Sequence, residues 1–140
     1  MAVHVLAVLA YKDGDRATST LLASSVNTNP VIIRRLLLAL QRAKLVDTRK
    51  GAGLGSRLSR SPARINLGDI YRAVEEPECF VMTRQKPDHA CPVGHCIRGA
   101  LETVFHSAED AIIRELSRTT LAHILATVKA ACDGPQKRGR

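Results

Sequence analysis

Hydrophobic residues recur at helical spacing in two adjacent segments near the start of the chain. Ser19 can cap the first segment, whose apolar positions are Leu21, Leu22, Ala23 and Val26. A polar turn at residues 27–30 follows, in which Asn29 suits a helix N-cap and Pro30 suits the first helical position. The second segment then places its apolar residues on one face of a helix, at Ile33, Leu36, Leu37, Leu40 and Ala43. The pattern predicts two short helices joined by a tight turn.

A hairpin is predicted directly after these helices. Leu45 and Val46 begin one strand, and Arg57 and Leu58 return on its partner. The tip between the strands is basic and rich in glycine, with Arg49, Lys50, Gly51, Gly53 and Gly55. The order helix, turn, helix, hairpin is typical of a winged helix-turn-helix domain.

The second helix carries basic residues outside its apolar stripe, mainly Arg34, Arg35 and Arg42. A helix with a buried stripe and a basic outer face, held across a short turn by another helix, fits the major groove of DNA. Taken singly, a basic helix face is usually only solvated and a glycine-rich tip only a turn. Their order and spacing together favour DNA binding over a purely structural three-helix module.

Composition agrees with a polyanionic partner. The chain has 140 residues, 21 Lys and Arg against 13 Asp and Glu, and a formal net charge of +8. An anionic membrane surface would suit that charge too, but no segment approaches the ~20 apolar residues that span a bilayer. Aromatic residues make up only 3% of the chain, which argues against stacking on single-stranded nucleic acid and for a duplex. The apolar run at residues 2–10 is interpreted as a buried helix of a cytoplasmic protein, not a signal segment.

The second half of the chain predicts further helices around a loop. Asn66 and Asp69 form a capping-box pattern before the stripe Leu67, Ile70, Tyr71 and Val74, and Pro77 stops that helix. A loop rich in Cys, His and Pro follows, and then a helix over residues 97–105. Ser107 is expected to cap one long helix that runs to about Cys132.

That long helix, about 35–40 Å at 1.5 Å per residue, exceeds what so small a domain can cover. The alternatives are dimerisation through it or an amphipathic helix folded back on the core, and dimerisation is favoured. The expected interface residues are Ile112, Leu116, Thr120, Ile124 and Val128.

The predicted fold is therefore mainly α, a winged helix-turn-helix domain with a small β-hairpin wing and a long C-terminal dimerisation helix. The expected organisation is a DNA-binding domain at residues 1–76, a possible sensor loop at 77–96, helices at 97–133 and a disordered basic tail at 134–140.

Three sequence runs together resemble the Rrf2 family of bacterial winged-helix repressors: NTNPVIIRRLL continuing into GAGLGSRL, then INLGDIYRAVEE, then CPVGHCI. The resemblance covers about residues 1–131. It implies a homodimer that binds pseudo-palindromic operators in double-stranded DNA. The chain departs from the family in two respects. Family members usually carry several more residues ahead of Met1, and Leu54 and Ser56 replace residues usually seen as Gly and a large side chain.

The resemblance also implies roles for single residues. Thr18 and Ser19 would touch phosphate at the first helix of the motif. Asn29, Val31, Arg34 and Arg35 would lie on the recognition helix. The segment from Arg49 to Arg57, with Lys50, Gly51 and Gly53, would form a wing in the flanking minor groove.

Cys79, Cys91 and Cys96 lie in one region together with His89 and His95. Thiolates and imidazoles could hold iron–sulfur or zinc, could act as a thiol switch, or could have no sensing role. Some Rrf2 members hold an iron–sulfur cluster on three closely spaced cysteines here. In this chain eleven residues separate Cys79 from Cys91 and four separate Cys91 from Cys96, and CPVG resembles the mostly cluster-free, YwnA-like subgroup. The default expectation is no cofactor, with an iron–sulfur cluster as the alternative.

No strand–turn–helix elbow or oxyanion motif accompanies the Cys and His residues, so an enzyme is not expected. The sequence leaves open a protein-interaction module that is regulated by a partner metabolic enzyme.

Overall fold

The computed structural model describes residues 1–51, 54–74 and 91–133. Within them the chain is mainly helical with one antiparallel hairpin, as predicted. The elements in order are α1 (Ala2–Tyr11), α2 (Ser19–Val26), α3 (Pro30–Arg42), β1 (Val46–Arg49), β2 (Gly55–Leu58), a 3-10 turn η1 (Pro62–Arg64), α4 (Leu67–Val74), α5 (Pro92–Ser117) and α6 (Leu121–Asp133). Among these helices none is long and apolar enough to cross a bilayer.

The core is formed by α1, α2 and α3 together with residues of β1, α4 and α6, such as Val46, Ile70 and Leu121. Val5, Leu6 and Leu9 of α1 are buried, which confirms that the apolar run at the start of the chain is a core helix. Ile33 and Leu40, from the predicted apolar stripe of α3, are buried in the same core. Because these residues recur at helical spacing, one face of each helix is removed from water and the other stays exposed.

The caps of α2 and α3 set the turn between them. The Asn29 side chain accepts a hydrogen bond from the N–H of Val31 at 2.8 Å, and Pro30 occupies the first turn, as predicted. For α2 the predicted N-cap, Ser19, is wrong by one residue. Thr18 is the N-cap, and its hydroxyl accepts a hydrogen bond from the N–H of Leu21, so Ser19 is the first helical residue. Asn27 ends α2 in the left-handed conformation at φ 57°, which Asn tolerates well.

The hairpin packs against the segment in front of α2. β1 and β2 pair antiparallel with Val46 opposite Leu58 and Arg49 opposite Gly55, and Ala17 forms a bridge to Ser56. At Gly55, φ is 124°, and a Cβ there would lie 2.8 Å from the carbonyl oxygen of Ala17. Only glycine therefore allows β2 to lie this close to residue 17.

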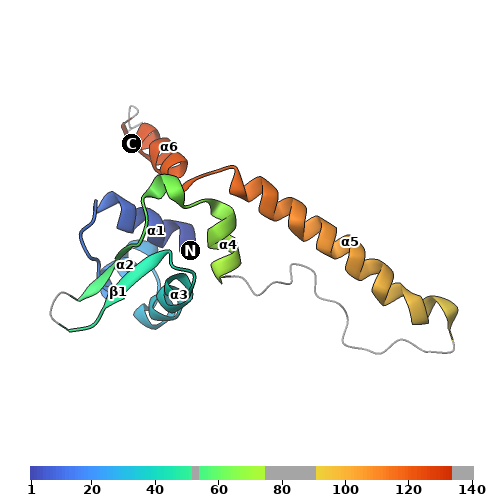
Figure 1. The fold of residues 1–140 in the computed structure, drawn as a ribbon. Coiled ribbons are helices and arrows are strands. Elements are labelled where there is room, and N and C mark those ends of the chain that lie inside the picture. The colour runs from blue at the N-terminus through green and yellow to red at the C-terminus, as the bar shows by residue number, and fades with distance from the viewer. Residues whose placement is uncertain (52–53, 75–90, 134–140) are drawn as a thin grey trace, which may run out of the picture.

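The C-terminal helices differ from the prediction. The expectation of one helix capped by Ser107 and running to Cys132 is wrong, because α5 begins at Pro92, passes through Ser107 and ends at Ser117. Residues 118–120 break the helical path, and α6 then returns over α1 (Figure 1). Cys96 therefore lies within a helix and not in the predicted loop.

Tertiary hydrogen bonds explain this break. The N–H of Leu67 donates to the carbonyl of Thr119 at 2.9 Å, and the N–H of Leu121 donates to the carbonyl of Ile65 at 2.8 Å. Backbone groups that would continue a helix are satisfied by the segment before α4 instead. The hydroxyl of Thr120 then caps α6 by accepting from the N–H of His123. Leu121, the first residue of α6, is fully buried.

From this junction α5 extends away from the domain. Figure 1 shows its C-terminal end beside α4 and α6 and its N-terminal end far from α1, α2 and α3. At about 1.5 Å per residue, 26 residues span about 39 Å. The described part of α5 has no buried residue.

Candidate nucleic-acid interface

The exposed face of α3 carries three of the side chains that the sequence assigned to DNA. Val31, Arg34 and Arg35 are exposed, while Ile33, Leu37 and Leu40 between them are buried. The helix is held rigidly at its start by the Asn29 cap and along its length by the core. A rigid helix with a solvent-facing row of side chains is what insertion into a groove requires.

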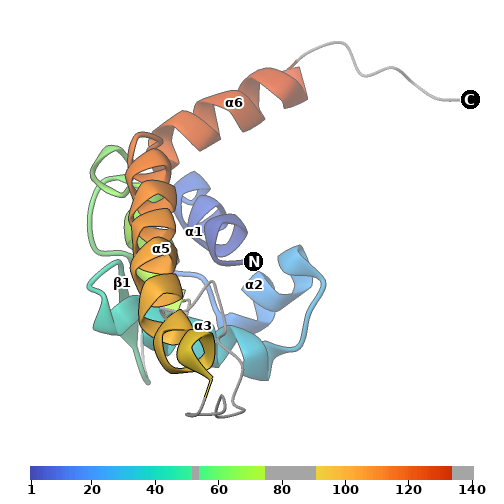
Figure 2. The ribbon, with the colours of Figure 1, turned by 90° about the vertical axis from the view of Figure 1, so that its right-hand side faces the viewer.

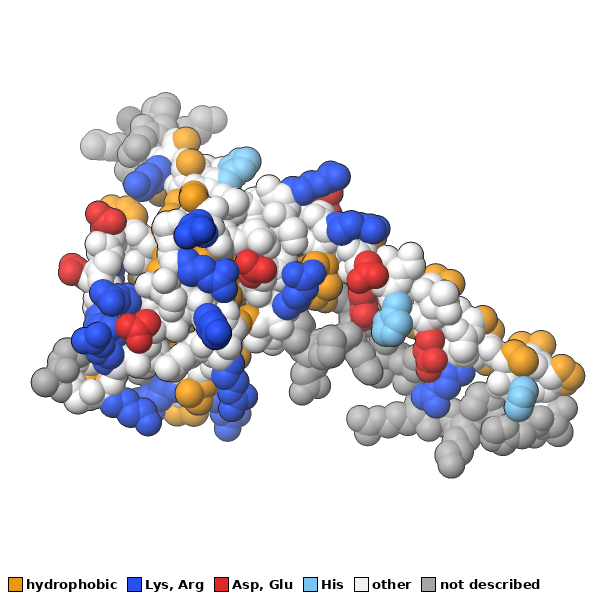
Figure 3. All heavy atoms as spheres, in the orientation of Figure 1, with side chains coloured by type: hydrophobic (Ala, Val, Ile, Leu, Met, Phe, Trp, Pro, Cys, Tyr) orange, Lys and Arg blue, Asp and Glu red, His pale blue; other side chains and the backbone are white. Residues whose placement is uncertain are grey.

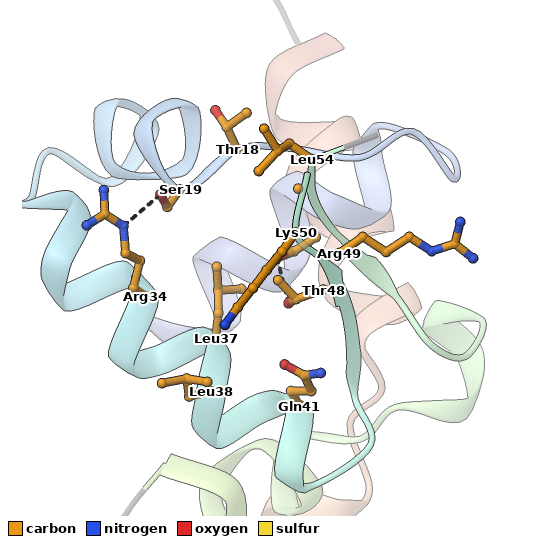
Figure 4. Close-up of a pocket in the computed structure, with 12 residues that line it drawn as sticks. Thr18, Ser19, Arg34, Leu37, Leu38, Gln41, Thr48, Arg49, Lys50 and Leu54 are labelled. Carbon is orange, nitrogen blue, oxygen red and sulfur yellow. Dashed lines mark hydrogen bonds between the residues drawn. The ribbon is translucent and has the colours of Figure 1, made fainter. Parts of the chain in front are cut away.

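Ser19 links α2 to α3 at this face. The Nε of Arg34 donates to the Ser19 hydroxyl at 3.4 Å, an interaction visible in Figure 4. Thr18 lies beside Ser19 and is exposed. The structure thus brings together Thr18 and Ser19, for which the family resemblance implies phosphate contacts, and Arg34, for which it implies a place on the recognition helix.

A hollow of about 400 Å³ separates α3 from the wing. Figure 4 shows Lys50 reaching across it from the wing toward α3, while Arg49 points away from it. The lining residues are Thr18, Ser19, Arg34, Leu37, Leu38, Gln41, Thr48, Arg49, Lys50, Leu54, Gly55 and Ser56. Sequence analysis did not assign Leu38, Gln41 or Thr48 to the site. The helical spacing of Val31, Arg34, Leu38 and Gln41 would have placed the first two of these unassigned residues on the same face of α3 as Val31 and Arg34.

The wing is fastened by a residue that sequence analysis missed. Arg16, in front of α2, donates to the Asp47 carboxylate at 2.5 Å and to the carbonyl of Gly55 at 3.0 Å. The hydrogen bond from Arg16, with the charges of Arg16, Arg49 and Arg57, lowers the pKa of Asp47 despite its partial desolvation. Asp47 therefore stays ionised within a basic surface and holds the wing in place.

Positive charge surrounds this hollow. Arg49 and Lys50 are exposed at the end of β1, and Arg57 lies on β2 with its Nε 3.5 Å from the Asp47 carboxylate. Gly51 adopts φ 85° at the turn, as expected of a tip glycine, whereas Gly53 lies outside the described residues. In Figure 3, Lys and Arg side chains dominate the face that carries the wing, and hydrophobic side chains gather at the far end of α5.

The residues expected at a dimer interface lie on different elements. Ile112 and Leu116 belong to α5, Thr120 to the break, and Ile124 and Val128 to α6. Leu116 is half-buried within its own protomer, where it lines a second hollow with Leu67, Ile70 and Val74. A single helical seam through all five residues is therefore excluded by the fold.

The cysteines do not form a ligand set within the described chain. Cys91 caps α5, its Sγ accepting from the N–H of Gly94 at 3.4 Å. Cys96 follows five positions later, so it lies about 140° around the helix from Cys91. Both thiols are exposed, and no group of three metal-binding side chains occurs among the described residues. Cys79 and His89 lie outside them. The described residues alone thus do not fit an iron–sulfur cluster.

Comparison with known proteins agrees with this geometry. Residues 1–127 match the model of the Rrf2 family, described as iron-dependent transcriptional regulators. YwnA of Bacillus subtilis, provisionally named an HTH-type transcriptional regulator, is 34% identical over 89% of this chain and 92% of its own. NsrR of Halalkalibacterium halodurans, an HTH-type transcriptional regulator, is 26% identical over 89% of this chain and 84% of its own.

Solved structures show the same fold. A crystal structure provisionally described as a DNA-binding protein has a TM-score of 0.71 at 34% identity, covering 89% of this chain and 95% of that one. CymR, the global cysteine regulator of B. subtilis, has a TM-score of 0.62 at 26% identity, covering 90% and 91%. The chain therefore belongs to the Rrf2 family and is a DNA-binding regulator of transcription, not an enzyme.

Proposed function

We propose that this regulator is a homodimeric repressor that places α3 in the major groove of each half of a pseudo-palindromic operator. The observation that carries the proposal is the position of the exposed face of α3 beside a basic wing, with the hollow between them. A helix in the major groove and a hairpin on the flanking backbone would together enclose one strand of a duplex.

Each part of this surface has a distinct role in the proposal. Thr18 and Ser19 donate hydrogen bonds to phosphate at the start of α2. Arg34 and Arg35 reach base edges, and Asn29 and Val31 define the end of α3 that enters the groove. Arg49, Lys50 and Arg57 neutralise phosphate or enter the minor groove, with Gly51 and Gly53 allowing the wing tip to approach the backbone.

The second copy is proposed to pack along α5. Val93, Ile97 and Val104 recur at helical spacing on this projecting helix, and Val93 and Val104 are 67% and 60% exposed. Half-buried Leu101 and Ile112 extend the row toward the domain. Two α5 helices packed together would remove this row of side chains from water and hold the two DNA-binding domains at a fixed spacing. The proposed interface is thus centred on α5. Of the residues expected from the sequence, it retains Ile112, and Ile124 and Val128 of α6 would make secondary contacts.

DNA binding is proposed to need no cofactor. Two exposed cysteines on different sides of α5 do not by themselves complete a cluster site, and nothing in the α3 and wing surface depends on them. Because its target is DNA, the protein would act in the cytoplasm.

The experiment compares two charge-matched double variants in a gel shift on the DNA upstream of the protein's own gene. Arg34→Ala with Arg35→Ala should weaken binding by several kcal/mol, at ~1–3 kcal/mol per lost base contact. The control is Arg64→Ala with Lys129→Ala on η1 and α6, which pack together at the opposite end of the domain from α3 (Figure 2). Equal operator affinities of the two folded variants would contradict the proposal that α3 contacts the bases of the operator.

A further inference from the structure

Two large apolar side chains occupy the centre of the exposed face of α3. Val31 is 49% exposed and Leu38 is 55% exposed. Seven residues turn a helix by about 700°, so the two side chains lie within about 20° of each other around the axis. Arg34 and Arg35, about 60° and 40° from Val31, flank this line on either side. The line of Val31 and Leu38 therefore lies between the two arginines on the exposed face of the helix, and it is apolar.

Neither residue is part of the hydrophobic core of its own domain. The buried stripe of α3 is formed by Ile33, Leu37 and Leu40. Leu38 instead borders the hollow between α3 and the wing (Figure 4). A single exposed apolar residue is ordinary. Two at the centre of the face that enters the groove need a partner with apolar groups.

The major groove offers one such group. Among the base edges only thymine presents a methyl, at C5, whereas the other contacts in this groove are hydrogen-bond donors and acceptors. Arginine pairs best with the O6 and N7 atoms of guanine, and Gln41, one turn beyond Leu38, suits adenine. The chemistry of this face therefore matches thymine methyls along the centre and purine edges beside them.

We propose that Val31 and Leu38 select operator half-sites by contacting the C5 methyl groups of two thymines. The proposal rests on the recognition role of α3 given above. Along the helix the two residues are about 10.5 Å apart, which corresponds to about three base-pair steps of 3.4 Å. Each half-site would then contain two thymine contacts about three steps apart, next to a purine contacted by Arg34 or Arg35.

The test replaces thymine with uracil, which removes only the methyl group. The operator duplex is first obtained by selecting bound sequences from a random duplex library with the full-length protein. Each thymine of a selected half-site is then changed to uracil in turn. At two positions the change should weaken binding about fourfold, the factor that corresponds to ~0.8 kcal/mol for one buried methyl-sized group.

Protein variants assign each methyl to its side chain. Val31→Ala should abolish the uracil penalty at one position, and Leu38→Ala should abolish it at the other. Ile32→Ala is the matched control, because Ile32 is 47% exposed but lies about 100° around α3 from Val31. Ile32→Ala should still lose affinity when uracil replaces thymine at either of the two positions. Alanine favours helix, so all three variants should fold, as circular dichroism will show.

The outcomes separate this inference from the proposed function. If no duplex is enriched, the operator-binding proposal itself fails. If duplexes are enriched but uracil costs nothing, or costs the same in wild type, Val31→Ala and Leu38→Ala, thymine selection by these residues is wrong while DNA binding by α3 stands. Loss of affinity in the variants without any uracil penalty in wild type would also overturn it, since the side chains would then contact something other than the methyl.

Discussion

The guanidinium of Arg16 forms an ion pair with the carboxylate of Asp47, with an N–O distance of 2.5 Å, and so joins the segment before α2 to the first strand of the wing. The same guanidinium also donates to the carbonyl oxygens of Asp47 and Gly55, which lie on the two strands of the hairpin. The wing is thereby fixed relative to the helix-turn-helix by a side chain outside both. We expect the angle between the wing and α3, and the hollow between them, to depend on this contact.

This relationship predicts a pH-dependent part of stability. The pKa of Asp47 is lowered from 3.8, mainly by its hydrogen bond with Arg16, so the folded state favours the ionised carboxylate. That contribution is complete above pH 3.8 and is lost as the pH falls through the lowered pKa. Asp47→Asn should be less stable than wild type at pH 7, and the difference should shrink at pH 3. Urea unfolding of both proteins at the two pH values measures it, and a constant difference would contradict the assignment.

Gly51 and Gly55 allow a matched comparison in the wing. Both have positive φ, but a Cβ at Gly51 meets nothing within 4 Å, whereas one at Gly55 meets the carbonyl of Ala17 at 2.8 Å. Gly51→Ala should cost only the conformational strain, ~1–2 kcal/mol. Gly55→Ala should cost more and should also break the bridge between Ala17 and Ser56. Urea unfolding and amide exchange at Ser56 test this; equal effects of the two variants would show that the close approach is unimportant.

The wing charges should act on phosphate rather than on base sequence. Arg49→Ala or Lys50→Ala should weaken binding to all duplexes alike and reduce the slope of log K against log salt by ~0.9. Arg57→Ala should change the slope less, because its guanidinium is 3.5 Å from the Asp47 carboxylate and is partly neutralised within the protein. Measurements of DNA affinity at several salt concentrations test this prediction. A loss of affinity that depends on the identity of one base pair, with an unchanged salt slope, would be inconsistent with phosphate contact.

The proposed dimer is tested at the projecting part of α5. If two α5 helices pack together, Val104→Asp should place a charge in their interface and give monomers with greatly weakened operator binding. The neighbouring Thr103→Asp is the control, since it adds the same charge about 100° around the exposed helix. Leu116→Asp would be a poor test, because Leu116 packs against α4 within its own protomer. Sedimentation of both α5 variants measures assembly, and a stable, DNA-competent Val104→Asp dimer would refute the seam.

The cysteines are expected to be dispensable for DNA binding. A variant with Cys79→Ser, Cys91→Ser and Cys96→Ser should bind the operator within about twofold of wild type, since none of the thiols in the described part of the chain lines the hollow between α3 and the wing. Protein purified without oxygen should be colourless. A brown, iron-containing preparation whose affinity changes on loss of iron would establish a cluster instead.

The sequence by itself determined the elements that depend on neighbours along the chain. The Asn29 cap, Pro30 and the stripe through Ile33 and Leu40 act within one or two helical turns, so α3 could be placed from the pattern alone. The hairpin was predictable for the same reason, from two short strands around a glycine-rich turn. The face of α3 that meets solvent then followed from helical geometry.

Contacts between distant segments decided the rest. The apolar spacing continues across residues 118–120, whereas the backbone groups of Thr119 and Leu121 pair with Leu67 and Ile65 where the predicted long helix divides into α5 and α6. Arg16 and Asp47 are 31 positions apart, so no local pattern shows that they fasten the wing. Sequence analysis gave Leu38 no role, and the fold places it beside the hollow and outside the core. Local periodicity specifies which segments are helical, but burial and backbone pairing across the chain specify where a helix ends and which apolar residues remain exposed to solvent.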